Sequence, residues 1–234
     1  MQPSVDVVVP VFNEEANVDE FYRRLSQAGY ATSLIVVDNA STDRTVERLQ
    51  RYPGVRLIRH ESNLGYGASI RDGIAACQGN VVVIIDADLE YPPEAIPDLL
   101  VALEHHSAVY ASRFLSGQPG GMPFLRRLGN GAISSIFNVL FRQRTTDLYT
   151  GMKGIRRDAL RGLVLEQNGF EHVLELSARL AMAGHRIHEI PVTYVPRAVG
   201  VSKMRHIPET LKYLWLVARY RLQWSRRPAQ AVTT

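Results

Sequence analysis

Residues 81–90 have the sequence Val-Val-Val-Ile-Ile-Asp-Ala-Asp-Leu-Glu, and this stretch decides the fold. Five β-branched residues in succession, preceded by a Gly-Asn pair, predict a buried strand of a parallel sheet. The strand ends abruptly in carboxylates. Asp86 and Asp88 are two residues apart and therefore on the same side of an extended chain, with Glu90 next in that row.

These three carboxylates form a candidate metal site. Clustered carboxylates repel each other unless a cation lies between them, and hard oxygen ligands suit Mg²⁺ or Mn²⁺. We therefore expect Asp86, Asp88 and Glu90 to bind a divalent cation. A solvent-exposed turn, or the N-cap of a helix before Pro92 and Pro93, is the alternative that this segment leaves open.

The length and composition fit one globular α/β domain, or one domain with a C-terminal appendage. A chain of 234 residues can bury a sizeable core, and 46% apolar with 21% charged residues is ordinary for a soluble protein. Cys77 is the only cysteine, which excludes an internal disulfide and fits a reducing compartment. We find no signal peptide and no run of about 18 apolar residues, so we expect a cytoplasmic location.

The charge is unevenly distributed. The net charge is +4, and cations accumulate in the second half of the chain. Such a bias suits phosphate-bearing partners or an anionic membrane surface, whereas the absence of any nucleic-acid-binding signature predicts no nucleic-acid partner. The cations concerned are Arg126, Arg127, Arg142, Arg144, Arg156, Arg157, Arg161, Arg197, Lys203 and Arg205.

Strand and helix patterns alternate along most of the chain. Such alternation predicts a doubly wound, mostly parallel sheet whose ligands lie at the carboxyl ends of the strands. Asp38 and the pair Asp86 and Asp88 follow two such ends, so we expect them to face one crevice. The predicted strands are 5–11, 34–37, 55–58, 81–85, 108–112, 152–155 and 188–194, the last at an edge; the predicted helices are 16–28, 45–51, 68–77, 93–104, 125–141, 169–183 and 208–224.

Five motifs occur in order. They are Val-Pro-Val-Phe-Asn-Glu at 9–14, Val-Val-Asp-Asn-Ala-Ser-Thr-Asp-Arg-Thr at 36–45, Asn-Leu-Gly-Tyr-Gly at 63–67, Asp-Ala-Asp at 86–88 and Arg-Ala-Val-Gly-Val-Ser-Lys at 197–203. Together they resemble the motifs of family 2 glycosyltransferases with the GT-A fold. More narrowly, they resemble those of the dolichol-phosphate and other polyprenyl-phosphate mannose and glucose synthases. The resemblance covers residues 4–205.

The resemblance implies a site for a nucleotide sugar. Asp86, Ala87 and Asp88 would meet the diphosphate and its cation, with Glu90 as a third metal ligand where some relatives carry Gln. A divalent ion and basic side chains would neutralise the departing pyrophosphate. The nucleotide pocket would be formed by Pro10, Phe12, Glu14, Val36, Asp38 and Gly65.

One departure from the family and several alternative interpretations remain at this pocket. Many relatives have two acidic residues where this chain has Asp38 followed by Asn39, which affects base preference. Phe12 could instead pack in the core, and Glu14 could instead stabilise the first turn of a helix. Gly65 and Gly67 fit either a close backbone approach to the ligand or an ordinary turn.

Basic residues of the second half match positions that bind donor and acceptor phosphates in the resembling synthases. Arg113 and Arg197 could each grip a phosphate in a bidentate way, and Lys203 could reach the pyrophosphate from a loop that orders over the donor. Arg126 or Arg127 would contribute to the same set, although a solvated surface is the alternative for both.

Asp147 has two interpretations. For a hydroxyl acceptor it would be a general base, whereas a phosphate acceptor is already an anion and leaves Asp147 to orient the acceptor or the structure. A turn cap is a third possibility. We expect the catalytic residues to be Asp88, Asp147, Arg197 and Lys203.

The C-terminal segment is a separate unit in this interpretation. We assign residues 1–205 to the catalytic domain and 206–234 to an amphipathic helix with a tail. Aromatic and arginine residues within 208–224 suit a helix at a membrane interface or on a membrane-anchoring protein, and packing on the protein's own core is the alternative. Attachment to the cytoplasmic face of a membrane is therefore part of the expectation.

The function expected first is inverting, metal-dependent transfer of mannose from GDP-mannose to a polyprenyl phosphate such as dolichyl phosphate. The alternative uses UDP-glucose or UDP-N-acetylglucosamine as donor and a hydroxyl group as acceptor, which could belong to a soluble small molecule. Asp147 would then be the base. A catalytically silent nucleotide-sugar-binding or membrane-scaffold protein is a third class, which the intact acidic and basic motifs disfavour.

Overall fold

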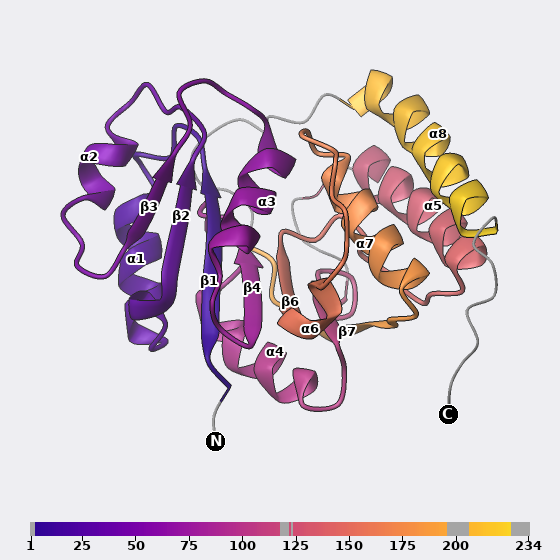
Figure 1. Cartoon of the computed structure of the whole chain (residues 1–234), viewed down its shortest axis with the longest axis horizontal. Helices are drawn as coiled ribbons and strands as arrows, with labels where there is room; N and C mark the ends of the chain where they lie inside the picture. The colour runs from indigo at the N-terminus through magenta and orange to yellow at the C-terminus, as the bar shows by residue number, and fades with distance from the viewer. Residues whose placement is uncertain (1–2, 118–121, 123, 196–205, 226–234) are drawn as a thin grey trace.

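The computed structural model describes residues 3–117, 122, 124–195 and 206–225. Within these ranges a seven-stranded sheet lies between two layers of helices (Figure 1). The strands are β1 (Val5–Val11), β2 (Leu34–Asp38), β3 (Arg56–Arg59), β4 (Val81–Ile85), β5 (Ala108–Ser112), β6 (Met152–Arg156) and β7 (Ile187–Pro191). The α-helices are α1 (Val18–Gln27), α2 (Thr45–Leu49), α3 (Tyr66–Ala76), α4 (Ile96–Leu103), α5 (Phe124–Phe141), α6 (Arg157–Leu160), α7 (His172–Met182) and α8 (His206–Ser225), and short 3₁₀ turns span η1 (Ala31–Ser33) and η2 (Pro93–Ala95).

The strand order is β3-β2-β1-β4-β6-β5-β7. The pairs β1–β2, β2–β3, β1–β4 and β5–β7 are parallel, and β6 runs antiparallel to both of its neighbours, β4 and β5. The predicted doubly wound, mostly parallel sheet is therefore confirmed. Since β6 is antiparallel, its first residues lie at the edge where β4 and β5 end, and the turn before β6 joins the carboxyl edge of the sheet.

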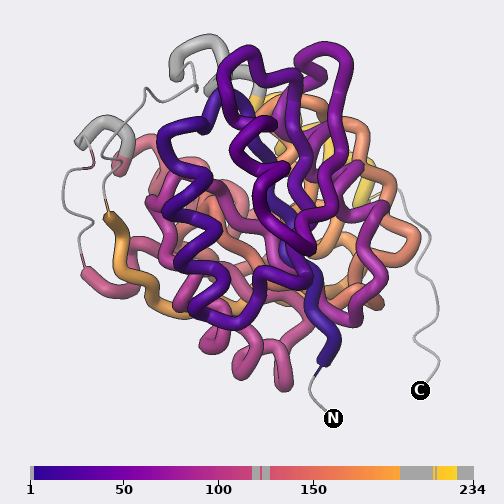
Figure 2. The backbone as a smooth tube through the Cα atoms, turned by 90° about the vertical axis from the view of Figure 1, so that its left-hand side faces the viewer, coloured from indigo at the N-terminus to yellow at the C-terminus, as the bar shows by residue number. Residues whose placement is uncertain are grey.

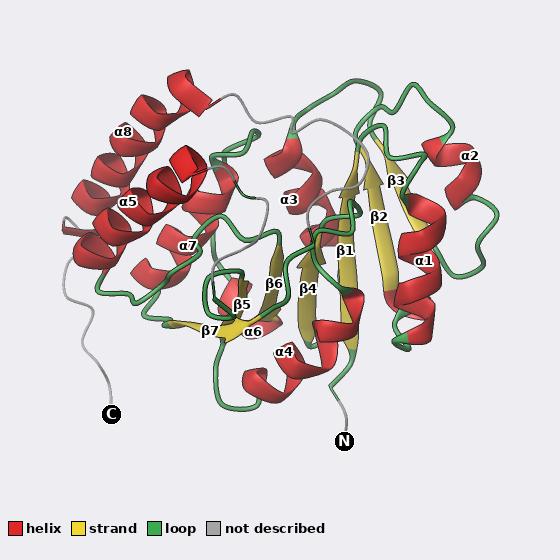
Figure 3. Cartoon of the chain, turned by 180° about the vertical axis from the view of Figure 1, so that it is seen from behind, coloured by secondary structure: helices red, strands yellow, loops and turns green. Residues whose placement is uncertain are grey.

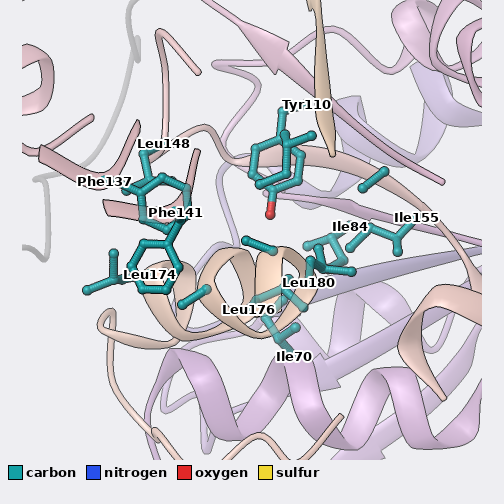
Figure 4. Close-up of a cluster of buried hydrophobic side chains, with 14 of the residues drawn as sticks. Ile70, Ile84, Tyr110, Phe137, Phe141, Leu148, Ile155, Leu174, Leu176 and Leu180 are labelled. Atoms are coloured by element: carbon teal, nitrogen blue, oxygen red, sulfur yellow. The ribbon is translucent and has the colours of Figure 1, made fainter. Parts of the chain in front are cut away.

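Both faces of the central strands are apolar, which is why their sequences are continuous Val and Ile runs rather than alternating patterns. On one face, Val8, Ile35 and Ile84 pack beneath α3, α5, α7 and α8. Part of this cluster is drawn in Figure 4, where Tyr110 and Ile84 lie on the strand side of the α7 side chains Leu176 and Leu180.

The opposite face of the sheet packs against α1, α2 and α4. Val7, Val9 and Val83 contribute to this second cluster, together with Phe21 of α1 and Leu99 of α4. Figure 3 shows α1 and α4 in front of the strands from this side, and Figure 2 faces the end of the sheet where α1 and α2 lie nearest the viewer. The two clusters leave the carboxyl edge of the sheet for polar residues.

The C-terminal helix α8 packs on the protein along one face. Tyr213, Leu216, Val217 and Tyr220 are buried in the cluster shared with α5 and α7. Packing on the protein's own core, one of the alternatives considered for this segment, therefore describes that face of the helix. The predicted domain boundary at residue 205 lies outside the described residues. No helix among the residues described is both long and apolar enough to cross a bilayer.

Most predicted elements agree with the structure to within a few residues. The predicted edge strand near residue 188 is β7, which within the described part of the chain pairs with β5 alone. The helix predicted from residue 68 begins two residues earlier, at Tyr66, because Gly65 adopts φ +100° and lets the chain turn directly into the helix. The short helix α6 was not predicted, since four residues are too few to show a helical period.

Candidate active site

The site is built at the carboxyl edge of β1, β2 and β4. Val11 at the end of β1 is in register with Asp38 at the end of β2, so the loops that follow these strands leave the sheet side by side. Hydrogen bonds join the two loops: the Asn13 amide donates to Ser41 Oγ at 2.9 Å, and the Glu14 amide donates to Thr45 Oγ1 at 2.8 Å. The predicted residues Phe12 and Glu14 thus lie beside Asp38 and are both partly buried.

Asp38 is fully buried at the end of β2. Its carboxylate accepts the Ser41 amide at 3.2 Å, and Arg59 Nε lies 3.8 Å from Oδ2. An open pocket adjoins it at the ends of β2 and β3, where a base or ribose would find both acceptors and cationic donors. The pocket is lined by Ala40, Ser41, Thr42, Arg59, His60 and Glu61.

Other predicted pocket residues are placed differently. The Val36 side chain is in the core, so Val36 can offer a ligand only its backbone. Pro10 is partly buried in β1, in register with Val37. Gly65 has the positive φ and the close backbone approach expected of it, but its neighbour is the protein itself: a Cβ here would lie 2.3 Å from the Asn168 carbonyl oxygen.

Asn39 explains one departure from the resembling family. Its Oδ1 accepts the Leu64 amide at 2.8 Å and lies 3.0 Å from His60 Nδ1, while its Nδ2 donates to Asn63 Oδ1 at 2.8 Å. An aspartate could accept at this position but could not donate to Asn63. The amide therefore fastens the 60–65 loop to the end of β2, a role that is structural. Asp38 itself is buried behind the pocket and contacts two of its lining residues, Ser41 and Arg59.

The carboxylates after β4 lie close together in a partly apolar setting. Asp86 Oδ1 accepts the Tyr66 hydroxyl at 3.1 Å, and Asp88 is buried with Oδ1 accepting the Glu90 amide at 3.0 Å. Leu89 makes the turn with φ +64°, and Ala87 is buried. Burial, followed by the negative charge of Asp88, raises the pKa of Asp86 to about 7.

The chemistry of these donors fits a hard divalent cation. A bound cation would relieve the repulsion among Asp86, Asp88 and Glu90, which adds to the larger effect of burial in raising the pKa of Asp86. The described residues nevertheless contain no group of three acidic, histidine or cysteine side chains already arranged around one point as a metal site. The donor types therefore suit Mg²⁺ or Mn²⁺, while a finished metal shell is not formed.

Asp147 is fully buried and is held by donors on both oxygens. Arg113 Nε donates to Oδ2 at 2.7 Å and Arg113 Nη2 to Oδ1 at 2.8 Å. Oδ1 also accepts from Asn130 Nδ2 at 3.1 Å, and the Arg113 amide donates to Oδ2 at 3.1 Å. Four donors converge on one carboxylate, so Asp147 has the contacts of a residue that orients an arginine rather than those of a general base.

Aromatic rings surround the Arg113 guanidinium. Its Cζ lies 5.7 Å from the ring centroids of Tyr91 and Tyr194 and 5.9 Å from that of Phe114. Such rings favour a cation and restrict its movement. With its side chain 12% exposed, Arg113 is a fixed, nearly enclosed positive charge at the end of β5.

Lys153 is a buried cation that the sequence interpretation missed. It lies in β6 in register with Ile84 of β4 and Tyr110 of β5, is 2% exposed, and donates through Nζ to the Thr150 carbonyl oxygen. Burial lowers the Lys153 pKa to about 8, and the charges of Asp86 and Asp147 oppose this shift. Lys153 is thus a shared counter-charge for the two acidic centres. The sequence feature that could have revealed this buried cation is a lysine within a short, otherwise largely apolar strand pattern.

Several predicted phosphate-binding residues cannot be placed. Arg197 and Lys203 lie outside the described residues, as does the side chain of Arg126. Arg127 is partly exposed on α5. The site residues that the structure does bring to one edge are therefore Phe12, Glu14, Asp38, Asp86, Asp88, Glu90, Arg113 and Asp147.

His172, at the start of α7, is 1% exposed and buried behind the site. Neither ring nitrogen has a hydrogen-bond partner among the described residues, and Nδ1 lies 3.8 Å from Glu175 Oε2, too far for a hydrogen bond. Burial, and then the positive charges of Lys153 and Arg71, lower the pKa of His172 to about 3.

We expect His172 to make the fold sensitive to acid. Between its ordinary pKa of 6.5 and its folded pKa of about 3, the unfolded chain binds a proton that the folded chain rejects. Stability is therefore lost as the pH falls through this window, by about 1.4 kcal/mol per pH unit. Urea unfolding at about pH 7 and about pH 5 should show a smaller loss for His172→Leu than for the wild type. Equal losses would mean that His172 is protonated in the folded protein.

The family is decided by comparison with known proteins. The sequence profile of the family described as Glycosyl transferase family 2 matches residues 6–164. The chain belongs to this family. The expectation raised by the five motifs, a family 2 glycosyltransferase with the GT-A fold, is confirmed.

Relatives of family 2 with named activities match most of the chain. It is 32% identical to the dolichol-phosphate mannosyltransferase of Pyrococcus furiosus over 228 residues, which cover 92% of this chain and 64% of that relative. It is 31% identical to the undecaprenyl-phosphate mannosyltransferase of Micrococcus luteus, over 84% of this chain and 86% of the relative. With the dolichol-phosphate mannosyltransferase of Saccharomyces cerevisiae the identity is 30%, over 87% and 82%. The chain thus spans less than two thirds of the Pyrococcus relative.

Solved structures share the fold of this family 2 member. The mannosyltransferase of Pyrobaculum calidifontis, solved with GDP-Man and Mn²⁺, has a TM-score of 0.62 at 20% identity, over 99% of this chain and 66% of that one. The glucosyl-3-phosphoglycerate synthase of Mycobacterium tuberculosis, solved with Mn²⁺, UDP-glucose and phosphoglyceric acid, has a TM-score of 0.66 at 22% identity, over 97% and 81%. At these identities the likeness concerns the fold, which serves donors with different bases.

Proposed function

We propose that the protein transfers a hexose, mannose in the first instance, from a nucleoside diphosphate sugar such as GDP-mannose to a polyprenyl phosphate such as dolichyl phosphate. The observation that carries this proposal is the arrangement of Arg113 and Asp147. Asp147 accepts four hydrogen bonds in a fully buried setting, which leaves it poorly suited to remove a proton from an alcohol. The relatives that act on lipid phosphates support the same choice.

A phosphate acceptor needs no general base. Its oxygen is already negatively charged at neutral pH and can attack the anomeric carbon directly, with inversion, while the nucleoside diphosphate leaves from the opposite side. The demand on the protein is electrostatic: it must bring two anionic phosphates together and stabilise the leaving group. The site residues would supply this through Arg113 and through the divalent cation that the acidic cluster after β4 would hold.

Arg113 is suited to bind the acceptor phosphate. Its Nε and one Nη2 hydrogen are directed at Asp147, and among the described residues no acceptor takes Nη1. The guanidinium therefore keeps donors for an incoming anion while its orientation is fixed by the carboxylate on the other side. Asp147 acts through Arg113 in this mechanism and does not touch the reacting atoms.

Asp86, Asp88 and Glu90 would hold the divalent cation that the donor requires. When bound, the cation would neutralise the diphosphate as it departs. The protein's own residues supply the surroundings: Lys153 balances the acidic cluster from behind, and the Asx turn formed by the Asp88 carboxylate and the Glu90 amide fixes the loop after β4. Nucleotide binding falls to the neighbouring pocket lined by Arg59, whose Nε faces the buried carboxylate of Asp38.

The helices α5 and α8 suit a membrane surface, where a polyprenyl phosphate would be found. Two sets of side chains support this role. Large apolar residues are exposed on both helices, and arginines accompany them that could meet anionic lipid head groups. The exposed apolar residues are Leu128, Ile136, Val139, Trp215 and Leu222, and the arginines are Arg142, Arg144, Arg219 and Arg221. We propose peripheral attachment to the cytoplasmic face of a membrane, either directly or through an anchoring protein.

Product analysis with a panel of donors and acceptors tests this function. GDP-mannose, UDP-glucose and UDP-N-acetylglucosamine are each incubated with the protein, Mn²⁺ or Mg²⁺, and either a polyprenyl phosphate, the corresponding polyprenol, or 3-phosphoglycerate. We expect sugar to appear on the polyprenyl phosphate and not on the polyprenol, most rapidly with GDP-mannose. Transfer to an alcohol, with no transfer to the lipid phosphate, would replace this proposal by a hydroxyl-directed reaction with a UDP-sugar.

A further inference from the structure

We infer that Tyr66 is a positioning residue that holds the Asp86 carboxylate in the orientation needed for the divalent cation, an inference that rests on the proposed metal-dependent function. Tyr66 is the first residue of α3, and its hydroxyl donates to Asp86 Oδ1 at 3.1 Å. Each carboxylate oxygen can accept two hydrogen bonds, so this contact leaves acceptor capacity on both oxygens of Asp86.

Gly151, in the turn before β6, lies against the Asp86 carboxylate at Oδ2, the oxygen that Tyr66 does not contact. A Cβ at this position would lie 2.4 Å from Asp86 Oδ2, which a real side chain could not accommodate. The same Cβ would lie 2.9 Å from Cε2 of Tyr91. Asp86 is therefore confined between the Tyr66 hydroxyl on one side and the Gly151 backbone on the other, and its side chain has little freedom to rotate.

Tyr66 is itself held by the loop before α7. The Asn168 carbonyl oxygen accepts the Gly67 amide at 2.7 Å and the Ala68 amide at 3.2 Å, which fixes the first turn of α3. The Tyr66 ring is stacked on the Phe170 ring, with centroids 5.1 Å apart and an interplanar angle of 17°. Backbone bonds and ring stacking thus determine the position of the hydroxyl independently of Asp86.

The same loop is anchored by the buried carboxylate of Glu175 in α7. Glu175 accepts the Glu166 amide at 2.9 Å, the Gln167 amide at 2.8 Å and the Tyr220 hydroxyl of α8 at 2.9 Å. Glu175 is fully buried, so these bonds are shielded from water. The orientation of Tyr66 is therefore supported from α7 and α8, and not only by its own helix.

In other proteins, mutating a residue that orients a metal-binding side chain lowers the affinity for the metal by about 10- to 100-fold. The variant Tyr66→Phe removes one oxygen atom and keeps the ring stacked on Phe170. We expect it to bind Mn²⁺ at least ~10-fold more weakly in the presence of saturating GDP, as measured by calorimetry or by Mn²⁺ magnetic resonance. Its melting temperature should remain within about 4 °C of that of the wild type, corresponding to one hydrogen bond.

Two further variants make the test specific. Tyr22→Phe is the matched control, because the Tyr22 hydroxyl donates to the Pro53 carbonyl oxygen at 3.1 Å on the α1 side of the protein; its Mn²⁺ affinity should be unchanged. Phe170→Leu keeps the Tyr66 hydroxyl but removes the stacking, and should weaken Mn²⁺ binding in the same direction by a smaller factor.

The outcomes separate this inference from the proposed function. Wild-type Mn²⁺ affinity in Tyr66→Phe, or a large fall in melting temperature with unchanged Mn²⁺ affinity, would show that Tyr66 only supports the fold and would overturn the inference alone. If the wild type binds no Mn²⁺ with GDP or UDP, the metal-dependent function and the role of Tyr66 are overturned together. A selective loss of Mn²⁺ affinity in Tyr66→Phe supports both.

Discussion

The variant Asp147→Asn is expected to lose about 3 kcal/mol of folding stability and at least ~10²-fold in transfer to polyprenyl phosphate. The physical reason is the uncompensated charge that the substitution leaves behind. Arg113 is 12% exposed and Asp147 is fully buried, so solvent cannot take over the role of the lost carboxylate. The asparagine keeps one acceptor oxygen where the aspartate offered two, and the guanidinium loses its bidentate partner.

Chemical denaturation and product analysis measure the two effects. The matched control is Asp158→Asn, which breaks the exposed pair between Arg156 and Asp158 and should cost about 0.5 kcal/mol or less, with no change in transfer. In the double variant Arg113→Met with Asp147→Leu, most of the stability should return because the buried ion pair is replaced by apolar groups. Transfer should stay low because the Arg113 guanidinium is missing. If Asp147→Asn keeps wild-type stability and transfers sugar to the lipid phosphate at the wild-type rate, then Arg113 does not depend on the Asp147 carboxylate for its stability or its orientation.

The second large effect is expected at Asp88. Asp88→Ala removes both a proposed metal ligand and the acceptor of the Glu90 amide, so we expect metal-dependent nucleotide binding to be lost and transfer to slow by at least ~10²-fold. The comparison is made by titrating GDP into the protein with Mn²⁺ and with chelator. In the wild type Mn²⁺ should strengthen GDP binding, and in Asp88→Ala the two titrations should coincide.

Glu90→Gln is the control for this variant. It keeps an oxygen ligand, removes one negative charge and matches the residue found at this position in some resembling synthases. We expect it to retain substantial Mn²⁺-dependent binding, since the backbone turn and two carboxylates remain. Turnover of Asp88→Ala at the wild-type rate in the presence of chelator would contradict the assignment of the metal site.

The features of this protein that can be predicted from its sequence are those that depend on local residue patterns. The Val and Ile run at 81–85 identifies β4 because five β-branched residues in succession suit a short strand buried on both faces, and the acidic residues after it mark the edge where ligands bind in such sheets. Asp38 follows from the same rule at the end of β2. Strands, their order of appearance and the acidic edge could therefore be expected without coordinates.

The unpredicted part depends on partners far apart in the sequence. Nothing near Asp147 indicates that Arg113 will grip both of its oxygens, and nothing near Asp86 indicates the hydroxyl of Tyr66. The direction of β6 was equally hidden, because Met-Lys-Gly-Ile-Arg has no feature that distinguishes a parallel from an antiparallel strand. Lys153 was overlooked for the same reason: its burial follows from neighbours supplied by β4 and β5.

Because β6 is antiparallel, the residues proposed to bind the acceptor lie on one continuous segment, which could be exchanged between proteins of this fold. Because β5 and β6 are adjacent and run in opposite directions, the chain leaves the sheet after Ser112 and returns at Met152 on the same edge. Residues 113–151 are thus an insertion between two neighbouring strand ends, and they carry Arg113, Asn130 and Asp147 together. The residues proposed to bind the nucleotide and the cation follow β1, β2 and β4 and lie outside it, but Gly151 at its end confines Asp86. Transplanting residues 113–150 from a relative with another acceptor should therefore replace the arginine together with its carboxylate and amide partners, with few changes to the strands that carry the proposed donor site.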